Sequence, residues 1–362
     1  MTNAAAVPVT YEDVTAQWLS DALQDSWPGV RIADLRRGAP FGYKQNKFRV
    51  AVDYADGHAG RPHRFIVKGN FPGQNDPATG SAWAMASELR SLRDVVPLVA
   101  APQGPPWRYI GVGEEASAIV MDDIGDSGAV FFDAFRTLDL GQAMAFIDVF
   151  ARMHASTWNS PMFKEGGAMG PGTLAAENRH MVNNVYFPTF FDRANWEGFV
   201  ALPRGRVLPR SFQEMARSQA AWEALWKLLG QSTMVVIHGD EHLGNLYVDD
   251  VGRPGVIDWV ARPEHWPIGI SYFLICALDV ADRRVWEKPL LAHYLTRLTT
   301  YGVQDAPLME DAWFLYRCAT LFPLITWLNN SAVWQPEAVN TANVTRAAVA
   351  ALDHDVLRLL GV

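Results

Sequence analysis

Hydrophobic and polar residues alternate in much of the first third of the chain, and this period-two pattern predicts β-strands. The alternating runs are expected to form two hairpins, with strands within 47–54, 64–71 and 107–124. Apolar residues at intervals of three and four predict a helix over 10–23, capped by Thr10, and a second helix over 81–95. The first third should therefore fold into a small antiparallel sheet with two helices.

The pattern changes near residue 125, where helical spacing becomes dominant. Helices are expected over 139–157, 210–230, 269–281, 283–301, 308–329 and 340–360. Short strand-like runs remain at 234–237, 246–248 and 254–257. We interpret 159–206, which is rich in Gly, Pro and aromatic residues, as an insertion that packs on the helical part and walls a pocket. The change from strand patterns to helical patterns predicts two lobes, 1–123 for nucleotide binding and 124–362 for catalysis and substrate binding.

Composition narrows the class of protein. A hydrophobic content of 49% and a charged content of 19% are typical of a soluble globular protein. The net charge of −8 argues against binding to nucleic acid or to anionic membranes. The cysteines, Cys276 and Cys318, lie in apolar helix-like stretches and indicate core thiols in a reducing cytoplasm. No signal peptide or membrane span is expected, and no obligate protein partner is predicted.

The most informative stretch contains His238, Gly239 and Asp240, followed by Asn245 and, thirteen residues later, by Asp258. These polar residues follow strand-like apolar runs, and a buried charge is costly unless a metal, a substrate or a turn pairs with it. The spacing is that of a kinase catalytic loop and its metal-binding segment. Phosphoryl transfer needs a carboxylate at the acceptor hydroxyl, and it needs oxygen ligands that hold Mg²⁺ against the nucleotide.

The upstream part of such a site is also present. Lys68 lies in the middle of a predicted strand, and Glu88 is the acidic residue in the middle of the helix between the two hairpins. A strand lysine paired with a helix glutamate steadies the α- and β-phosphates in kinases. The strand end at Asp122, Asp123 and Ile124 would link the lobes and offer main-chain groups to adenine.

These motifs resemble the aminoglycoside phosphotransferase/choline kinase-like family, nearest its ecdysteroid-kinase-like and uncharacterised bacterial branch. The matching words are HGDEHLGN (238–245), VIDW (256–259), IVMDDI (119–124) and FARMHASTW (150–158). The resemblance implies an α+β, bilobal protein-kinase-like fold with a small antiparallel-sheet N-lobe and a mainly helical C-lobe. It further implies ATP and Mg²⁺ as cofactors, Asp240 as catalytic base, and Asn245 and Asp258 as magnesium ligands. Lys68 and Glu88 would be the nucleotide pair.

Two segments depart from the family pattern. The expected phosphate loop, 37–50, holds only the glycines Gly38 and Gly42, so we expect the residues at its tip, Gln45 and Asn46, to contact the nucleotide. The segment after Asp258 lacks the acidic residue that often precedes the next helix in the family.

The acceptor is predicted to be a small, partly apolar alcohol. The expected substrate segments, 177–200 and 308–335, hold few acidic residues and many aromatic ones, whereas an aminoglycoside pocket should be strongly acidic. A choline-like cation on aromatic faces remains open. Two other functions also remain open: a zinc-dependent hydrolase using His238, Asp240 and His242, and a nucleotide-binding module without turnover.

Overall fold

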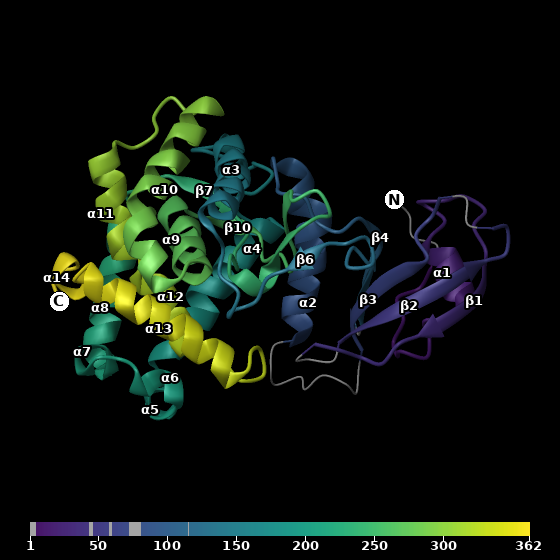
Figure 1. Ribbon diagram of the computed structural model, residues 1–362, viewed down its shortest axis with the longest axis horizontal. Helices are drawn as coiled ribbons and strands as arrows, with labels where there is room; N and C mark the ends of the chain where they lie inside the picture. Colours follow the sequence, from purple (N-terminus) through teal and green to yellow (C-terminus); the bar gives the residue numbers. More distant parts are fainter. Residues whose placement is uncertain (1–4, 43–45, 58–59, 72–80, 115) are drawn as a thin grey trace. The chain divides into compact units, whose positions relative to one another are not determined.

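The computed structural model describes residues 5–42, 46–57, 60–71, 81–114 and 116–362 (Figure 1). Two compact units are present, and their segments are interleaved along the sequence. The first unit contains Met1–Asp94, Gln103–Val130 and Asp249–Gly252, and the second contains Val95–Pro102, Phe131–Val248 and Arg253–Val362. The assignment of 1–123 and 124–362 as functional lobes stays a prediction.

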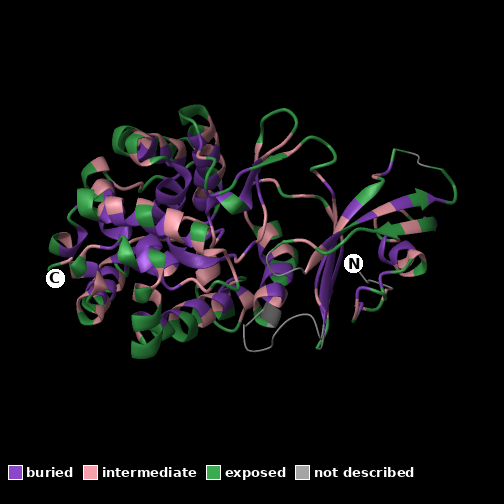
Figure 2. Cartoon of the chain, turned by 60° about the horizontal axis from the view of Figure 1, so that its bottom comes forward, coloured by how far each residue is buried: buried purple, intermediate pink, exposed green. Residues whose placement is uncertain are grey.

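An antiparallel sheet forms the centre of the first unit. Its described strands run in the order β1-β2-β3-β5-β4. Their bounds are β1 Ile32–Arg37, β2 Lys47–Tyr54, β3 Arg64–Asn70, β4 Trp107–Val112 and β5 Ser117–Asp122. Buried and more exposed positions alternate along β2, as the colours of Figure 2 illustrate, because successive side chains point to opposite faces. The edge strand β1 was not predicted, since most of its residues are exposed.

Helices cover the two faces of this sheet. Val67 belongs to the core that includes residues of α1 (Ala16–Ala22), whereas Ile119 packs with residues of α2 (Ser81–Arg90). Lys68 is the cross-strand partner of Ile119, so strand alternation turns it away from Val67 and towards α2.

The prediction of Thr10 as the cap of the first helix was wrong. The cap of α1 is Thr15, whose hydroxyl accepts a hydrogen bond from the Trp18 amide at 3.1 Å. Thr10 instead belongs to the preceding turn, where its own amide donates to the Asp13 carboxylate at 2.7 Å.

Helices packed around a fully buried helix, α9 (Trp266–Ala277), form most of the second unit (Figure 1). The longer surrounding helices are α3 Leu140–Ser156, α8 Met215–Leu229, α10 Val280–Thr300, α11 Met309–Ala319, α12 Leu321–Leu328 and α13 Glu337–Asp353. The helix expected over 308–329 is divided at Thr320, and Pro323 lies in the first turn of α12, where a missing N–H is tolerated. A final short helix, α14 (Val356–Leu359), follows α13.

The aromatic segment 159–206 contains several short helices packed on this unit. They are α4 Leu174–His180, a π-helical turn Met181–Tyr186, a 3₁₀ turn Phe187–Phe191, α5 Arg193–Ala201 and α6 Pro203–Arg206, with α7 Arg210–Gln213 following. Phe187 packs edge-on against Trp222 of α8 and Phe322 of α12, with ring centroids 5.2 Å and 5.7 Å away. This packing agrees with our interpretation of the segment as an insertion on the helical part.

Short strands carry the motif residues of the second unit. β7 (Met234–Ile237) pairs antiparallel with β10 (Arg262–His265), and β8 (Leu246–Val248) lies between β6 (Val130–Phe131) and β9 (Pro254–Val256). β10 was not predicted, because its sequence is Arg-Pro-Glu-His, although all four residues are buried. The chain turns sharply after β7 and again after β9.

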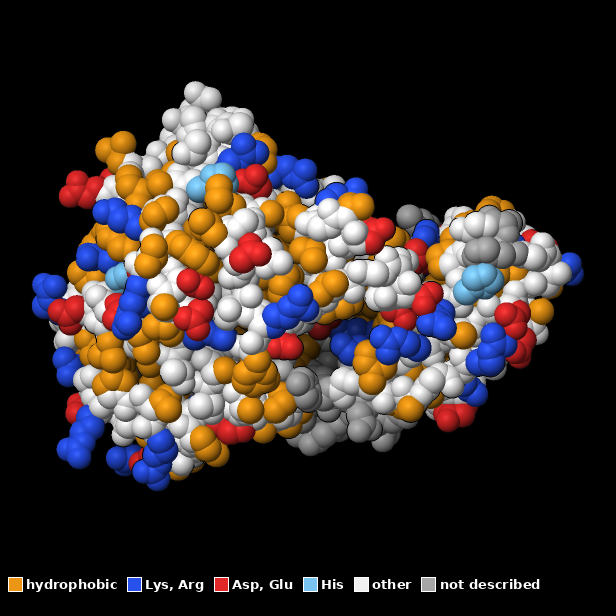
Figure 3. Space-filling model, viewed as in Figure 1, with side chains coloured by type: hydrophobic (Ala, Val, Ile, Leu, Met, Phe, Trp, Pro, Cys, Tyr) orange, Lys and Arg blue, Asp and Glu red, His pale blue; other side chains and the backbone are white. Residues whose placement is uncertain are grey.

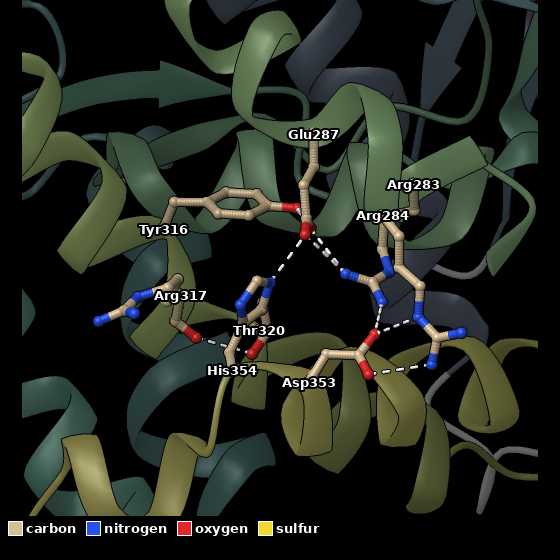
Figure 4. Close-up of polar contacts among 8 residues, drawn as sticks. All are labelled: Arg283, Arg284, Glu287, Tyr316, Arg317, Thr320, Asp353 and His354. Carbon is tan, nitrogen blue, oxygen red and sulfur yellow. Dashed lines mark hydrogen bonds and ion pairs between the residues drawn. The ribbon is translucent and has the colours of Figure 1, made fainter. Parts of the chain in front are cut away.

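A network of charged side chains, centred on the buried Arg283 and Glu287, lies between α10, α11 and α13 (Figure 4). Glu287 accepts hydrogen bonds from Arg283 at 2.8 Å and from Tyr316 at 3.0 Å, and it lies 3.1 Å from His354 Nε2. Asp353 binds both Arg283 and the more exposed Arg284. The network ties three helices together.

Acidic and basic side chains are interspersed on the face shown in Figure 3. In the described residues, no helix combines the length and the apolar character needed to cross a bilayer.

Candidate active site

Two turns of the second unit are joined by main-chain hydrogen bonds. The Val260 amide donates to the His238 carbonyl at 3.0 Å, and the Ile257 amide donates to the Asn245 carbonyl at 2.9 Å. The loop after β7 is therefore fixed against the loop after β9. These bonds bring the segments that carry Asp240, Asn245 and Asp258 together, as their spacing predicted.

His238 fixes the same two loops through its ring. Its Nε2 lies 2.9 Å from the Ile257 carbonyl oxygen, and its Nδ1 accepts from the Asp240 amide at 3.3 Å. A ring that donates at Nε2 and accepts at Nδ1 is neutral, and burial correspondingly lowers the pKa of His238 to about 4. We conclude that His238 has a structural role in the loop 238–245, which we name the catalytic loop after its predicted function.

Asp258 has a left-handed backbone conformation, with φ of +59°. Asp visits this region more readily than most residues because its short polar side chain can bond locally. The adjacent Trp259 is buried, with its ring centroid 4.6 Å from that of His238. Asp258 thus occupies a sharp turn that is anchored on the catalytic loop.

The Asp240 carboxylate is surrounded by hydrogen-bond donors. Tyr272 Oη donates to Oδ1 at 3.0 Å, Asn245 Nδ2 donates to Oδ2 at 2.9 Å, and His242 Nε2 lies 3.3 Å from Oδ2. Burial by itself would raise the pKa of Asp240, but the attraction and hydrogen bond of His242 outweigh burial and lower this pKa below its ordinary value. The side chain is nevertheless 37% exposed. The site therefore presents an ionised carboxylate that a ligand can reach.

His242 is oriented by the backbone that follows it. The Gly244 amide donates to His242 Nδ1 at 3.0 Å, which leaves Nε2 to carry the proton that faces Asp240. The His242 ring also packs edge-on against Trp327, with centroids 5.1 Å apart. In this arrangement His242 serves as a donor to Asp240.

Asn245 and Asp258 offer oxygen atoms that suit magnesium. The Asn245 amide nitrogen donates to the Asp240 side chain and main chain, both at 2.9 Å, so its oxygen is the atom left for a ligand. Mg²⁺ prefers oxygen ligands and is commonly held by one or two protein groups together with phosphates. The donor set fits this ion, and Asn245 and Asp258 as its ligands remain a prediction.

The first unit contains the predicted lysine–glutamate pair. Lys68 Nζ lies 2.6 Å from Glu88 Oε2, and each side chain is only 9% exposed. The pair is flanked on α2 by Met85 and Leu89, whose side chains are buried against the sheet. The structure thus brings Lys68 and Glu88 together, and their contact with a nucleotide stays a prediction.

Main-chain donors at the end of β5 have partners within the first unit. The Asp122 amide donates to Pro106, the Asp123 amide to Arg64 and the Ile124 amide to Asp122, at 2.9, 3.2 and 3.0 Å. An adenine contact through these amides would have to replace such bonds. The carboxylates of Asp122 and Asp123 are paired with arginines, Arg108 and Arg49, at 2.8 Å each.

The phosphate-loop prediction is only partly covered by the structure. Gln45 lies outside the described residues. Asn46 directly precedes β2, and its carbonyl accepts from the Gly69 amide at 2.9 Å, next to Lys68 in β3.

Sequence reasoning missed two residues of the catalytic loop's surroundings. Tyr272 lies in the fully buried helix α9 and donates to Asp240. Glu241 is 1% exposed, and its carboxylate accepts from the Gly239 amide at 3.1 Å. Glu241 stood inside the HGDEHLGN motif and Tyr272 inside a predicted helix, but nothing in the sequence gave the partners of their side chains.

Comparison with protein families finds a match around the predicted site. Residues 142–261 match the model of a family described as the phosphotransferase enzyme family, and this stretch contains Asp240, Asn245 and Asp258. The match confirms the resemblance to aminoglycoside phosphotransferases and choline kinases that the sequence predicted. This part of the chain is therefore similar to phosphotransferases.

Solved structures resemble the chain over most of its length. An ethanolamine kinase from Plasmodium vivax superposes with a TM-score of 0.52 at 9% identity, covering 94% of this chain and 89% of the other. The choline kinase LicA from Streptococcus pneumoniae gives 0.47 at 10% identity, covering 93% and 98% of the two chains. The predicted protein-kinase-like fold, with an antiparallel sheet early and helices late, is confirmed. No curated protein sequence matches the chain significantly.

Proposed function

We propose that the chain transfers the γ-phosphate of ATP to the hydroxyl of a small, partly apolar alcohol, with Asp240 as the catalytic base. The observation that carries this proposal is the Asp240 carboxylate, which is held by Tyr272, Asn245 and His242 and yet remains 37% exposed. A base of this kind must be ionised, oriented and accessible to the proton that it accepts. The lowered pKa of Asp240 supports the first requirement.

In this proposal the chain's own groups position the reactants. Asp240 orients the acceptor hydroxyl and takes its proton, while the amide oxygen of Asn245 and the carboxylate of Asp258 hold Mg²⁺. Bound magnesium supplies charge neutralisation for the phosphate oxygens. Lys68, held by Glu88, is assigned to the α- and β-phosphates of the nucleotide, and the main-chain groups of Asp122–Ile124 to its base.

The surroundings of Asp240 support a partly apolar acceptor. Burial, and after it the charge of Asp240, raises the pKa of Tyr186 to about 12, so its phenol stays protonated. Trp327 packs on His242, and Tyr272 packs edge-on against Phe322 at 5.7 Å. Tyr186, Phe322 and Trp327 come from the segments that the sequence assigned to substrate binding, 177–200 and 308–335, and Tyr272 comes from α9.

The geometry argues against a zinc hydrolase. His238 uses both ring nitrogens for main-chain partners, and His242 Nδ1 accepts from an amide, so the two rings are not free to ligate together with Asp240. Among the described residues, no group of three or more His, Cys, Asp or Glu side chains could hold a metal ion.

The direct test is a screen of hydroxylated compounds with Mg–ATP, read as a mass gain of one phosphate. We expect neutral alcohols with an apolar body to be phosphorylated and polyamines to be inert. ATP binding with no acceptor phosphorylated would favour the nucleotide-binding module without turnover.

A Lys68→Ala variant tests the nucleotide assignment, with the exposed Lys227→Ala as its matched control. Calorimetric titration should show weaker ATP binding for Lys68→Ala alone. Equal ATP affinity in both variants would contradict the role of Lys68.

A further inference from the structure

The catalytic loop bends sharply one residue before Asp240. Gly239 has φ of +95°, a conformation that favours glycine. A Cβ at this position would lie 2.2 Å from the Val260 oxygen and 2.5 Å from Arg262 Nη1, so no larger residue fits. The direction in which the Asp240 side chain leaves the strand depends on this bend.

Two buried charged side chains hold the two polar groups of Gly239. Glu241 Oε1 accepts from the Gly239 amide at 3.1 Å, and Arg262 Nη1 donates to the Gly239 carbonyl at 3.3 Å. Glu241 is 1% exposed and Arg262 is 2% exposed. Arg262 Nη1 also donates to the Val260 carbonyl at 3.3 Å and thereby joins the catalytic loop to the turn after Asp258.

Helix α9 leaves room for the Glu241 carboxylate. A Cβ on Gly269 would stand 3.3 Å from Glu241 Oε1, which is tighter than ordinary van der Waals contact. The sequence lacks an acidic residue at the start of this helix, and the carboxylate of the loop itself occupies the adjoining space. Burying a carboxyl group is unfavourable, and burial raises the pKa of Glu241 against the opposing effects of the Gly239 hydrogen bond and the Arg262 charge. A buried carboxyl group in the catalytic loop therefore calls for a functional reason.

We propose that Glu241 is a positioning residue for Asp240. By accepting from the Gly239 amide it fixes the His238–Gly239 peptide, while Arg262 fixes the carbonyl of the Gly239–Asp240 peptide, so both peptides on either side of Gly239 are held. Glu241 acts through the backbone and not on the reacting atoms. The inference rests on the proposed function, because it takes Asp240 as the base.

The test compares two replacements of Glu241. Glu241→Gln keeps the shape and a carbonyl oxygen that can accept from Gly239, whereas Glu241→Leu keeps the volume and removes the acceptor. Mg–ATP is the probe, and both its hydrolysis by water and transfer to the acceptor from the screen are measured per folded molecule. We expect Glu241→Leu to lower kcat by about 10–100-fold, since misplacement of a reacting group by about 1 Å has effects of this size. Its KM for ATP should stay near that of the wild type, and Glu241→Gln should restore most of kcat.

Amide hydrogen exchange provides a readout that does not depend on activity. The Gly239 amide should exchange faster in Glu241→Leu than in the wild type, and Glu241→Gln should restore its protection. A third variant, Gly269→Ala, leaves Glu241 itself unaltered and adds a Cβ that would lie 3.1 Å from Ile237 Cγ2 and 3.3 Å from Glu241 Oε1. It should lower thermal stability, because it crowds the buried strand as well as the carboxylate, and it should also lower kcat per folded molecule.

The results separate this inference from the proposed function. If Asp240→Asn keeps full transfer, the proposed function itself fails. If Asp240→Asn is inactive while folded Glu241→Leu retains the wild-type kcat, only the positioning role is overturned. Equal losses of kcat and of Gly239 protection in the Gln and Leu variants would likewise overturn it, because the accepting atom would then be irrelevant.

Discussion

Two carboxylates of the second unit have similar partners and different exposure. Glu287 is contacted by Arg283, Tyr316 and His354 in the network of Figure 4, and its side chain is 6% exposed. Asp240 also has three donors, yet its side chain is 37% exposed. The pKa of each carboxyl group is lowered, because in each case the partners outweigh the burial that would raise it.

The difference shows what distinguishes a site from a structural ion-pair network. Perturbed pKa values are frequent at functional sites, but ion-pair networks perturb them as well. Glu287 is enclosed by the groups that bind it, so its charge serves to hold helices together. The charge of Asp240 remains accessible, so it can serve a ligand.

The largest effect on activity should come from Asp240→Asn. The amide keeps the shape of the side chain but cannot take a proton, and loss of a general base typically costs about 10²–10⁴-fold in rate. We expect a loss of kcat in this range, measured per folded molecule. The free energy of unfolding should fall as well, because the amide has only one oxygen for the three groups that donate to the Asp240 carboxylate. The exposed Asp305→Asn serves as the matched control. Near wild-type transfer by Asp240→Asn would show that the exposed carboxylate of Asp240 is not the catalytic base.

The largest effect on stability should come from Glu287→Ala. It leaves Arg283, which is 1% exposed, without the carboxylate that two of its hydrogen bonds reach. Breaking a buried pair by removing one partner destabilises by about 3–5 kcal/mol. Urea unfolding should show a loss of this size, with kcat per folded molecule unchanged.

Glu223→Ala, on the exposed face of α8, is the control for Glu287→Ala and should change stability by no more than about 0.5 kcal/mol. A selective loss of kcat in Glu287→Ala would mean that the network is coupled to catalysis.

The sequence predicted correctly those residues whose positions follow from the period of a strand or from the fixed spacing of a motif. Strand alternation sets Lys68 on the face opposite Val67, and Glu88 is an acidic residue on the helix that covers that face. The turns around Asp240 and Asp258 follow from the spacing between two short strands. Such features depend on local geometry, which can be predicted from the pattern of residues in a single sequence.

The features that were missed depend on contacts between distant segments. Tyr272 looks like one more apolar position of α9, and its partner Asp240 lies 32 residues earlier in the chain. The burial of Glu241 depends on the space beside Gly269. Strand β10 was overlooked because Arg262 and Glu264 are charged yet buried, a combination that hydrophobic patterns exclude.

A neutral histidine extends the comparison to the pH dependence of stability. Burial lowers the pKa of His154 to about 3, below its ordinary value of 6.5, and its Nδ1 lies 2.9 Å from Tyr294 Oη. Between pH 3 and pH 6.5 the unfolded chain therefore binds a proton at His154 that the folded protein does not bind. The stability contributed by neutral His154 is fully present above pH 6.5 and is lost as the pH falls towards 3.

Replacing His154 by Gln should flatten this dependence. Between pH 6.5 and pH 5 the wild type should lose about 2 kcal/mol more than His154→Gln, at about 1.4 kcal/mol per pH unit. Urea unfolding across this range measures the difference. His238, whose pKa is also lowered, to about 4, is present in both proteins and cancels. Parallel pH profiles would show that His154 is already charged in the folded state.

The smallest and sharpest effect should distinguish two tyrosines with the same geometry. Tyr272 donates to Asp240 and Tyr316 donates to Glu287, each at 3.0 Å, and both side chains are buried. Removal of one such hydroxyl is worth about 1–3 kcal/mol, because the bond reaches a charged acceptor. Phenylalanine at either position should therefore lower the free energy of unfolding by a comparable amount.

Tyr272→Phe alone should also reduce kcat, by about 5–10-fold, because roughly 1 kcal/mol of orientation is lost at the reacting carboxylate. Steady-state kinetics with Mg–ATP, beside urea unfolding of both variants, measures the two effects separately. If Tyr316→Phe slowed transfer as much as Tyr272→Phe, exposure would not separate the catalytic carboxylate from the structural one.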